Sequence, residues 1–313
     1  MFVKTSITLS ILIPCYNWDI CQLVYKIHDL CTNNLKLYKY EIICIEDESK
    51  KTFNNTNIST LSNTQYIILN ENIGRSRIRN LMANKSKHKW LLFIDCDSKI
   101  TDDFFINKYI TYAIQHEEQQ KMKINLDKSL YYGSTLYLEK KPDKNKILHW
   151  KYGKEIESKL KHINFSSHHF LIQKNMFNQH NTQFDESIKL YGYEDVFFVI
   201  KHRIKAIYIN NPVYHIGIKN SSEFIHDTES ALRNLILNKA LENNLKNKIK
   251  IIKISKIVSK LFMNNTLIYL YLFFKKRIKI NLLSESPSLF LFQFYKLGFF
   301  LHTKKHINSR KKS

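Results

Sequence analysis

The chain has 313 residues, of which 44% are hydrophobic, and its 20 Phe and 18 Tyr exclude a disordered protein. Its formal net charge of +22 indicates an anionic partner, such as a membrane surface, a nucleic acid or an acidic substrate. Five cysteines without a CxxC pair argue against a disulfide framework and favour a reducing, cytoplasmic compartment.

The first hundred residues alternate between the patterns of strands and of helices. Short β-branched or apolar runs indicate strands, and apolar residues three or four positions apart indicate helices. The alternation predicts an α/β fold with parallel strands and helices on both faces of the sheet. The expected strands are 7–13, 41–45, 66–69 and 90–94, and the expected helices are 20–37 and 76–83. Beyond the first hundred residues, a further strand is expected over 130–138.

Polar side chains follow three of these strands. Tyr16 and Asn17 follow the first strand, Asp47 follows the second, and Asp95 and Asp97 follow the fourth. In open α/β sheets, ligands bind beyond the carboxyl ends of the strands. The three polar clusters therefore predict one binding site at that edge.

The triplet Asp95-Cys96-Asp97 is a candidate metal site. Two carboxylates after a buried strand are costly unless a cation neutralises them, and their hard oxygen atoms suit Mg²⁺ or Mn²⁺. Such a cation keeps open positions for phosphate oxygens. The alternative is that the triplet only caps the helix expected after residues 101–103, and the triplet alone does not decide between the two.

Two further groups of residues are candidates for catalysis. Glu194 and Asp195 open an apolar helix, where the helix dipole favours negative charge, and a buried carboxylate there can have the pKa of a general base. His215 could be a third metal ligand or a hydrogen-bonded core histidine. His168 and His169 are adjacent and point to opposite faces of a strand, so at most one can enter the site, and we place neither among the metal ligands.

Five short elements follow one another along the chain: Ile-Pro-Cys-Tyr-Asn (13–17), Glu-Asp-Glu-Ser (46–49), Asn-Ile-Gly-Arg-Ser-Arg-Ile-Arg-Asn (72–80), Asp-Cys-Asp (95–97) and Gly-Tyr-Glu-Asp (192–195). Through the order and spacing of these elements, the chain resembles glycosyltransferase family 2 from about residue 8 to about residue 241. The resemblance implies a GT-A-type, Rossmann-like nucleotide-sugar-binding domain with a mixed central sheet over residues 1–245. It also implies inverting transfer with a divalent cation, Mn²⁺ or Mg²⁺.

The resemblance also implies roles for single residues. Asp195 would be the catalytic base and Glu194 would orient the acceptor or the loop, while Asp47 would accept the ring N–H of a uracil base. The family pattern has Asp where Glu46 stands and Gly where Glu48 stands, so the backbone of this loop is expected to differ. The implied nucleotide-binding residues are Pro14, Tyr16, Asn17, Asp47, Arg79, Asn80 and Asp95, and the implied metal ligands are Asp97, His215 and Asp95.

Residues 246–313 form a basic tail. They contain 16 Lys and Arg against one acid, Glu285, and so carry +15 of the net charge of +22. A lysine stripe and two aromatic patches predict a helical appendage in peripheral contact with an anionic membrane. Two alternatives are an appendage that packs on the catalytic domain and a general bias of the sequence towards Lys, Asn and Ile. No run of about 18 apolar residues is present, so we expect no transmembrane helix.

The sequence thus predicts an enzyme that moves a hexosyl or N-acetylhexosaminyl group from a nucleotide-sugar donor to a hydroxyl of a glycan or lipid-linked acceptor. The resemblance implies that the nucleotide of the donor is UDP. Its expected role is cell-surface polysaccharide synthesis in the cytoplasm, at the inner face of the cell membrane, with no nucleic-acid partner. One alternative is a nucleotidyltransferase of sugar metabolism, which usually has a Gly-rich loop where residues 14–17 stand. Another is a basic nucleic-acid-binding protein, which leaves Asp95, Asp97 and Asp195 without a task.

Overall fold

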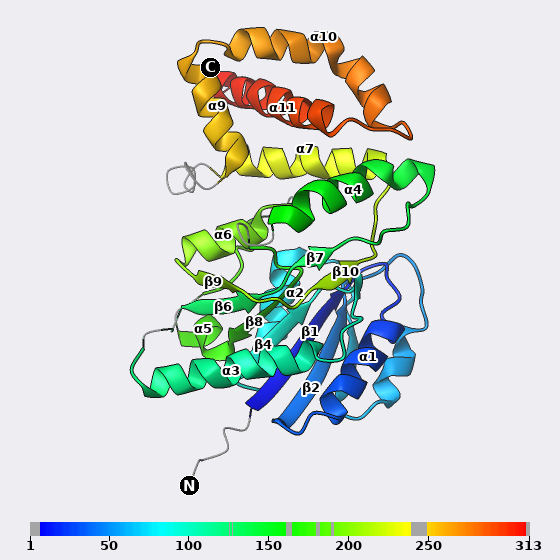
Figure 1. The fold of residues 1–313 in the computed structure, drawn as a ribbon, viewed down its shortest axis with the longest axis vertical. Coiled ribbons are helices and arrows are strands. Elements are labelled where there is room, and N and C mark those ends of the chain that lie inside the picture. Colours follow the sequence, from blue (N-terminus) through cyan, green and yellow to red (C-terminus); the bar gives the residue numbers. More distant parts are fainter. Residues whose placement is uncertain are drawn as a thin grey trace.

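A computed structural model describes residues 7–124, 126, 128–160, 165–179, 182–188, 191–238 and 249–310. Figure 1 shows two parts, a central sheet between helices and a layer of long helices beyond one edge of that sheet. The N-terminal strand lies in the middle of the sheet, and the chain ends among the outer helices (Figure 1).

The central sheet has seven strands in the order β3-β2-β1-β4-β8-β6-β9. The first four are parallel to one another, whereas β8 runs antiparallel to both β4 and β6. The predicted mixed sheet is therefore confirmed. The strands are β1 (Ile7–Cys15), β2 (Leu37–Glu46), β3 (Thr64–Ile68), β4 (Trp90–Ile94), β6 (Ser129–Tyr132), β8 (His169–Gln173) and β9 (Lys205–Tyr208).

Strand β4 is buried on both faces, as its uninterrupted apolar sequence predicts. Because successive side chains of a strand alternate, Trp90, Leu92 and Ile94 pack into one hydrophobic core, and Leu91 and Phe93 pack into the other. Helices α1 and α3 cover the first face, and α2, α5 and α6 cover the second. These helices are α1 (Cys21–Thr32), α2 (Gly74–Lys85), α3 (Phe105–Lys121), α5 (Lys174–Gln179) and α6 (Glu194–Lys201), and a short 3₁₀ helix, η1 (Asn55–Thr60), precedes β3.

The first helix ends earlier than the sequence pattern predicts. We expected a helix over 20–37, but α1 stops at Thr32 and β2 begins at Leu37. Leu35, which continues the apolar spacing, is 93% exposed and packs on nothing. The apolar pattern therefore runs across the junction between the helix and the strand, and the local turn decides where the helix ends.

A small second sheet lies beyond the carboxyl ends of β1 and β4 (Figure 1). It has the order β5-β10-β7, with strands β5 (Ser98–Lys99), β7 (Thr135–Leu136) and β10 (Val213–His215). The strand predicted over 130–138 is divided between β6 and β7 at Gly133. A Cβ atom there would lie 2.0 Å from the Asn211 carbonyl oxygen and 2.3 Å from the His169 ring, so only glycine allows this close approach.

The remaining helices form a layer on the far side of this small sheet (Figure 1). Their shared core includes Leu148, Leu232, Tyr271, Phe292 and Tyr295, so the C-terminal helices pack against α4 and α7. The domain boundary predicted near residue 245 lies outside the described residues. The elements are η2 (Lys144–Lys146), α4 (Ile147–Tyr152), the π-helical turn η3 (Gly153–Glu157), η4 (Ser158–Leu160), α7 (Ser221–Leu237), α9 (Lys250–Lys260), α10 (Asn264–Leu282) and α11 (Leu289–Arg310).

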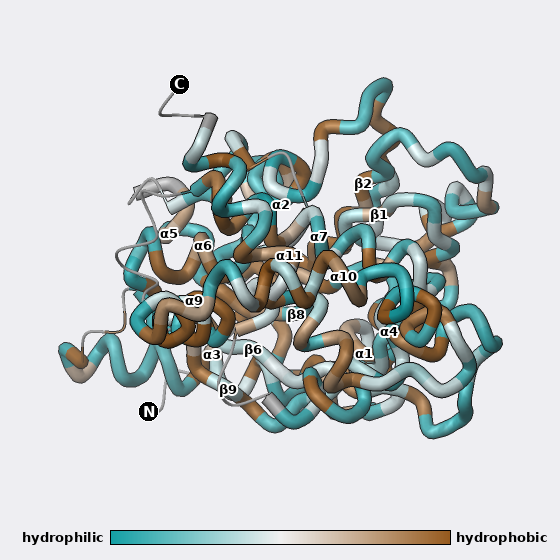
Figure 2. Tube along the Cα trace, turned by 90° about the horizontal axis from the view of Figure 1, so that it is seen from above, coloured by the Kyte–Doolittle hydropathy of each residue, from teal (hydrophilic) through white to brown (hydrophobic). Residues whose placement is uncertain are grey.

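Helix α10 is the outermost of these helices (Figure 1). Seen from this side, hydrophobic and hydrophilic residues alternate along α10 and α11 (Figure 2). Several of the hydrophobic side chains are exposed on α10, among them Tyr269, Leu272, Phe273 and Ile280. Across the described ranges, no helix alone has the length and hydropathy needed to cross a membrane. The pair α9 and α10, bent by 117°, meets these criteria only when both helices are taken together.

Candidate active site

The carboxylates of Asp95 and Asp97 lie at the end of β4, next to the imidazole of His168. One ligand atom from each of the three residues lies within 4.8 Å of the others. The pairing of β4 with β8 explains this cluster, because it sets Ile94 opposite His169 and lets the Asp95 amide donate to the His168 carbonyl at 2.8 Å. Burial lowers the pKa of His168, which favours the neutral imidazole that a metal ion requires.

His215 reaches the same cluster from β10. Its Nε2 lies 2.9 Å from Asp97 Oδ2, and β10 is held there by pairing His215 with Ser98 of β5. Burial opposes charge on both groups, but their mutual attraction lowers the pKa of Asp97 and raises that of His215. A Cβ atom on Gly217 would lie 2.2 Å from Asp97 Oδ2, so the backbone closes directly over this carboxylate.

A chain of polar groups supports His215 from behind. The Tyr137 hydroxyl lies 3.4 Å from His215 Nδ1 and donates a hydrogen bond to Glu157. Tyr137 in turn packs on Gly153, where a Cβ atom would lie 2.1 Å from its ring. The π-helical turn that follows α4 therefore helps to fix the orientation of His215, and through it that of Asp97.

Arg79 supplies a buried positive charge beside the cluster. Its side chain is 3% exposed, and Nη2 donates to Asp95 Oδ1 at 2.8 Å. Its Nε and Nη1 atoms have no hydrogen-bond partner among the described residues. A buried guanidinium with unused donors can bind a phosphate or diphosphate group.

Glu194 and Asp195 stand at the start of α6, as the sequence predicts. The preceding Gly192 and Tyr193 both have positive φ, 94° and 67°, and the Gly192 position is packed against Ala231 of α7. Such a conformation is costly for tyrosine and is tolerated where the surrounding structure enforces it. The turn thereby aims the first residues of α6 towards the cluster.

Asp195 is tied to the segment that carries His168. Its Oδ2 accepts a hydrogen bond from the Ser167 amide at 3.3 Å, and its Oδ1 accepts one from the Val196 amide at 2.7 Å. Burial, and then the neighbouring charge of Glu194, raise the pKa of Asp195 to about 7. A carboxyl group with this pKa can take up a proton near neutral pH.

The predicted nucleotide-binding residues Pro14, Tyr16 and Asn17 lie at the end of β1. Pro14 is paired with Ile45 of β2, and the ring of Tyr16 is 44% exposed. Asn17 has a φ of 53°, and its Oδ1 accepts the backbone amide of Lys50 at 2.8 Å. Asn17 therefore joins the β1 loop to the β2 loop, and Tyr16 offers an open aromatic surface.

Asp47, at the end of β2, holds the start of α2. Its two carboxylate oxygens accept the amides of Ile73 at 2.7 Å and Gly74 at 3.0 Å. Burial raises the pKa of Asp47 although these amides oppose the shift. Each carboxylate oxygen keeps a further lone pair, so Asp47 retains acceptor capacity for the predicted contact with a base.

The two departures from the family pattern have separate structural outcomes. Glu46 is buried and accepts hydrogen bonds from the Tyr66 hydroxyl at 2.7 Å and from Asn55 at 3.4 Å, so it belongs to the scaffold. Glu48 has a φ of 54°, in the region that favours glycine. The loop thus contains a left-handed residue at the position where the family pattern has glycine.

Asn80 points away from the cluster. Its Nδ2 donates to the Phe184 carbonyl and to Glu186, both at 2.9 Å, and its Oδ1 accepts the Phe184 amide at 2.9 Å. These contacts join α2 to the segment before α6. These bonds engage both polar atoms of the Asn80 side chain. The nucleotide contact predicted for Asn80 stays a prediction.

Two residues at this site were not assigned to it from the sequence. The sequence indicates that only one of the adjacent residues His168 and His169 can enter the site, but not which one. The register of β8 against β4 places His168 beside Asp95 and Asp97. Arg75, in the first turn of α2, has its guanidinium over the ring of Tyr191 at 4.7 Å and lies 3.9 Å from Glu194. Arg75, Tyr191 and Glu194 line a cavity of about 430 Å³ at the start of α2.

Comparisons with known proteins agree with this geometry. The model of the family described as glycosyl transferase family 2 matches residues 10–180. A mannosyltransferase from Pyrobaculum calidifontis, PcManGT, solved in complex with GDP-Man and Mn²⁺, has a TM-score of 0.56 at 10% identity, over 99% of this chain and 89% of that one. This likeness shows a shared fold.

The chain is also similar to the solved structure of TarS from S. aureus. It matches with a TM-score of 0.47 and 16% identity over 74% of this chain, and the match spans 40% of the TarS chain. Residues 1–349 of TarS in complex with UDP-GlcNAc match with a TM-score of 0.47 and 13% identity, over 96% of this chain and 92% of that one. A search of curated proteins gave no match. Because the family model covers more than half of its residues, the chain belongs to glycosyltransferase family 2.

Proposed function

We propose that the chain is an inverting glycosyltransferase that moves a hexosyl or N-acetylhexosaminyl group from a UDP-sugar to a hydroxyl of a glycan or lipid-linked acceptor, in cell-surface polysaccharide synthesis. The observation that carries this proposal is the grouping of Asp95, Asp97 and His168 beside the buried Arg79, with Asp195 bonded to the same segment as His168. Metal ligands, a cation for phosphate and a candidate base thus converge on one place.

The residues of the cluster fit a divalent cation. Two carboxylates and a neutral imidazole form a mixed oxygen and nitrogen donor set that suits Mn²⁺, and Mg²⁺ would rely on the carboxylates. Asp97, Asp95 and His168 or His215 would hold the ion, and it would supply positive charge for a diphosphate. Support comes from PcManGT, a neighbour of the same fold that was solved with Mn²⁺.

Asp195 would act as the general base. In the transfer, a hydroxyl oxygen of the acceptor forms a bond to the anomeric carbon, and the bond from that carbon to the diphosphate oxygen breaks. The hydroxyl proton passes to the Asp195 carboxylate, whose raised pKa suits it to accept a proton. The unpaired donors of Arg79 would stabilise the negative charge that develops on the leaving diphosphate.

The choice of UDP rests on the loops after β1 and β2. Tyr16 offers an exposed ring on which a base could stack, and Asp47 retains acceptor capacity for a ring N–H. The positively charged Arg75, next to Tyr191, would lie on the phosphate side of such a nucleotide. Among the similar folds, TarS was solved with UDP-GlcNAc and PcManGT with GDP-Man, so both nucleotides belong in the test.

A thermal-shift screen tests the donor and the metal together. The wild-type protein is heated with UDP-sugars or GDP-sugars, each with and without Mn²⁺. We expect a UDP-sugar to raise Tm only when Mn²⁺ is present, because a ligand stabilises the folded state that binds it. Asp97→Ala should lose this shift, whereas Glu118→Ala, at an exposed position of α3, should keep it. A metal-independent shift, or none with any nucleotide, would contradict the proposal.

We also propose peripheral contact with the inner face of the cell membrane, where a lipid-linked acceptor would be found. Exposed apolar side chains on the outermost helix, α10, lie among Lys275, Lys276 and Arg277, and such a surface suits an anionic bilayer. The five cysteines are all free thiols, which agrees with a reducing compartment. Contact with the bilayer would bring the acceptor to the enzyme by diffusion in two dimensions.

A further inference from the structure

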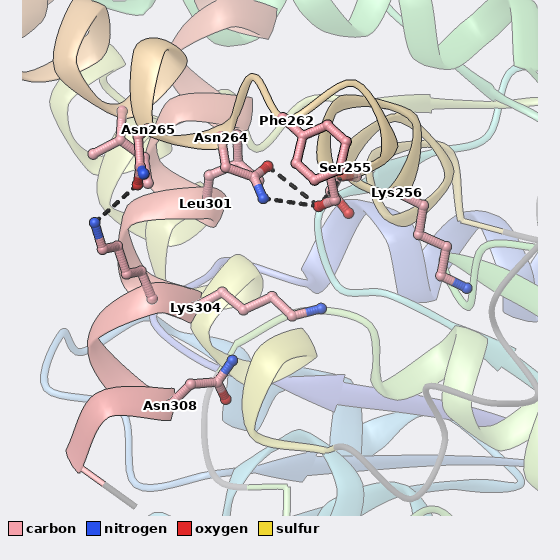
Figure 3. A pocket seen from close by; sticks show the side chains of 11 residues that line it. Ser255, Lys256, Phe262, Asn264, Asn265, Leu301, Lys304 and Asn308 are labelled. Carbon is pink, nitrogen blue, oxygen red and sulfur yellow. Dashed lines mark hydrogen bonds between the residues drawn. The ribbon is translucent and has the colours of Figure 1, made fainter. Parts of the chain in front are cut away.

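A second cavity lies among the C-terminal helices and shares no residue with the candidate active site. It has a volume of about 530 Å³ and is formed where α9 and the start of α10 meet α11 (Figure 3). These helices lie on the far side of α4 and α7 from the central sheet (Figure 1). The sugar-transfer chemistry therefore gives this cavity no task.

The walls of the cavity carry positive charge. Lys256 from α9 and Lys304 and Lys305 from α11 line it, and none of the described lining residues is acidic. Figure 3 shows Lys304 extended across the cavity, with Lys256 on the opposite side. Glu285, the one acid of residues 246–313, is paired with Lys144 at 2.7 Å and does not line the cavity.

Neutral hydrogen-bonding groups complete the lining. Asn264 and Ser259 exchange a hydrogen bond at 3.0 Å, and Lys305 Nζ donates to Asn265 Oδ1 at 2.9 Å (Figure 3). No side chain in the described chain caps the first turn of α10, so the positive end of this 19-residue helix also faces the region. Ammonium, amide and hydroxyl donors around one cavity match a group with several anionic oxygens, such as a phosphate ester.

We propose that this cavity binds the phosphate headgroup of an anionic membrane phospholipid. The assignment rests on the proposed membrane contact and gives it a specific site. Phe262 lies on the rim and is 93% exposed, and Met263 beside it is also exposed. With the phosphate in the cavity, these side chains are placed to enter the acyl region, and Tyr269 and Phe273 on α10 extend the same apolar surface.

The test uses the full chain and two double variants that remove equal charge. Lys256→Ala with Lys304→Ala alters the cavity, and Lys85→Ala with Lys87→Ala, both exposed near the end of α2, is the matched control outside it. Calorimetric titration measures binding of monomeric dihexanoyl phosphatidylglycerol and of inorganic phosphate. Co-sedimentation measures binding to phosphatidylcholine vesicles with and without phosphatidylglycerol, and melting curves confirm that both variants are folded.

We expect the cavity variant to bind the monomeric lipid about 30-fold more weakly than wild type, because each ammonium group beside an anionic headgroup contributes several-fold in affinity. The control should bind it as wild type does. Equal affinity of the two variants for the monomeric lipid would overturn the cavity, even if vesicle binding persists. Inorganic phosphate binding as tightly as the lipid would overturn the lipid assignment. Binding of the monomer without any binding to vesicles would support the cavity and refute the membrane contact.

Discussion

Asp195 illustrates how one residue can acquire a chemical role from its surroundings. Its carboxylate accepts hydrogen bonds from two backbone amides, and burial is the largest cause of its raised pKa. The resulting pKa of about 7 means that the group is protonated below neutral pH and ionised above it. A base works only in its ionised form, so its protonation directly limits the rate.

We therefore predict that kcat/KM rises with pH up to about 7 and is level above it. Below the pKa, the ionised fraction falls about ten-fold for each pH unit, and the rate should follow.

Asp195→Asn should keep donor binding and reduce transfer by at least about a thousand-fold. Initial rates across pH, with donor affinity measured separately, check both statements. Substantial turnover by Asp195→Asn would remove this residue from the role of base.

The variant Glu194→Gln tests what sets the pKa of the Asp195 carboxyl group. The negative charge of Glu194 is the second cause of the raised pKa of Asp195, after burial. Its removal should lower that pKa and move the acidic limb of the rate profile to lower pH by roughly one unit. The pH profile of the variant is the measurement, and a limb that stays in place would show that burial alone sets the pKa.

Gly217 controls the position of a candidate metal ligand without touching the ion itself. A Cβ atom there would lie 2.2 Å from Asp97 Oδ2, so Gly217→Ala must displace the carboxylate. Changes of this kind behind a ligand lower metal affinity by about 10- to 100-fold. We expect a matching rise in the Mn²⁺ concentration needed for the thermal shift. The exposed Glu118→Ala, which is also the control for Asp97→Ala, should leave this concentration unchanged.

At the scale of elements, the site depends on pairings that are far apart in sequence. The end of β4 was predicted, and it places Asp95 and Asp97 as expected. His168 joins them only because β8 runs antiparallel beside β4, and a periodic pattern gives neither the partner nor the direction of a strand. For the same reason, the division of 130–138 at Gly133 was missed, since its cause is contact with Asn211 and His169.

The junction between α2 and the segment before α6 gives a prediction at this scale. Asn80→Ala would leave the Phe184 amide and carbonyl without their partner in a buried place. We expect a loss of about 2–4 kcal/mol in the free energy of unfolding, measured with urea. The exposed control Asn57→Ala should change it by less than about 0.5 kcal/mol. A variant of unchanged stability that binds the donor weakly would instead support the nucleotide contact predicted for Asn80.

At the scale of the whole molecule, the C-terminal helices pack on the catalytic part with one face and leave apolar side chains exposed on the other. Phe292 and Tyr295 of α11 are buried in the core shared with α7, so the alternative of an appendage packed on the catalytic part is realised in the structure. That packing leaves the outer face of α10 open, and contact with a membrane remains compatible with it. Removal of residues 246–313 would expose this core, so point substitutions are the better test of membrane contact.

Leu272→Ser with Phe273→Ser removes two exposed apolar side chains of α10 and leaves every lysine in place. A fully buried apolar side chain contributes about 1.5–3 kcal/mol, and these two are expected to insert partly into the bilayer. The variant should therefore bind vesicles that contain phosphatidylglycerol at least about ten-fold more weakly than wild type. Leu35→Ser with Tyr38→Ser is the matched control, since both residues are exposed before or within β2, at the opposite end of the molecule (Figure 1). Co-sedimentation measures the affinity, and melting curves should be unchanged for both variants. Equal losses in the two pairs would exclude α10 as the membrane-facing surface, whereas a loss confined to the α10 pair would orient the enzyme with its outermost helix on the bilayer.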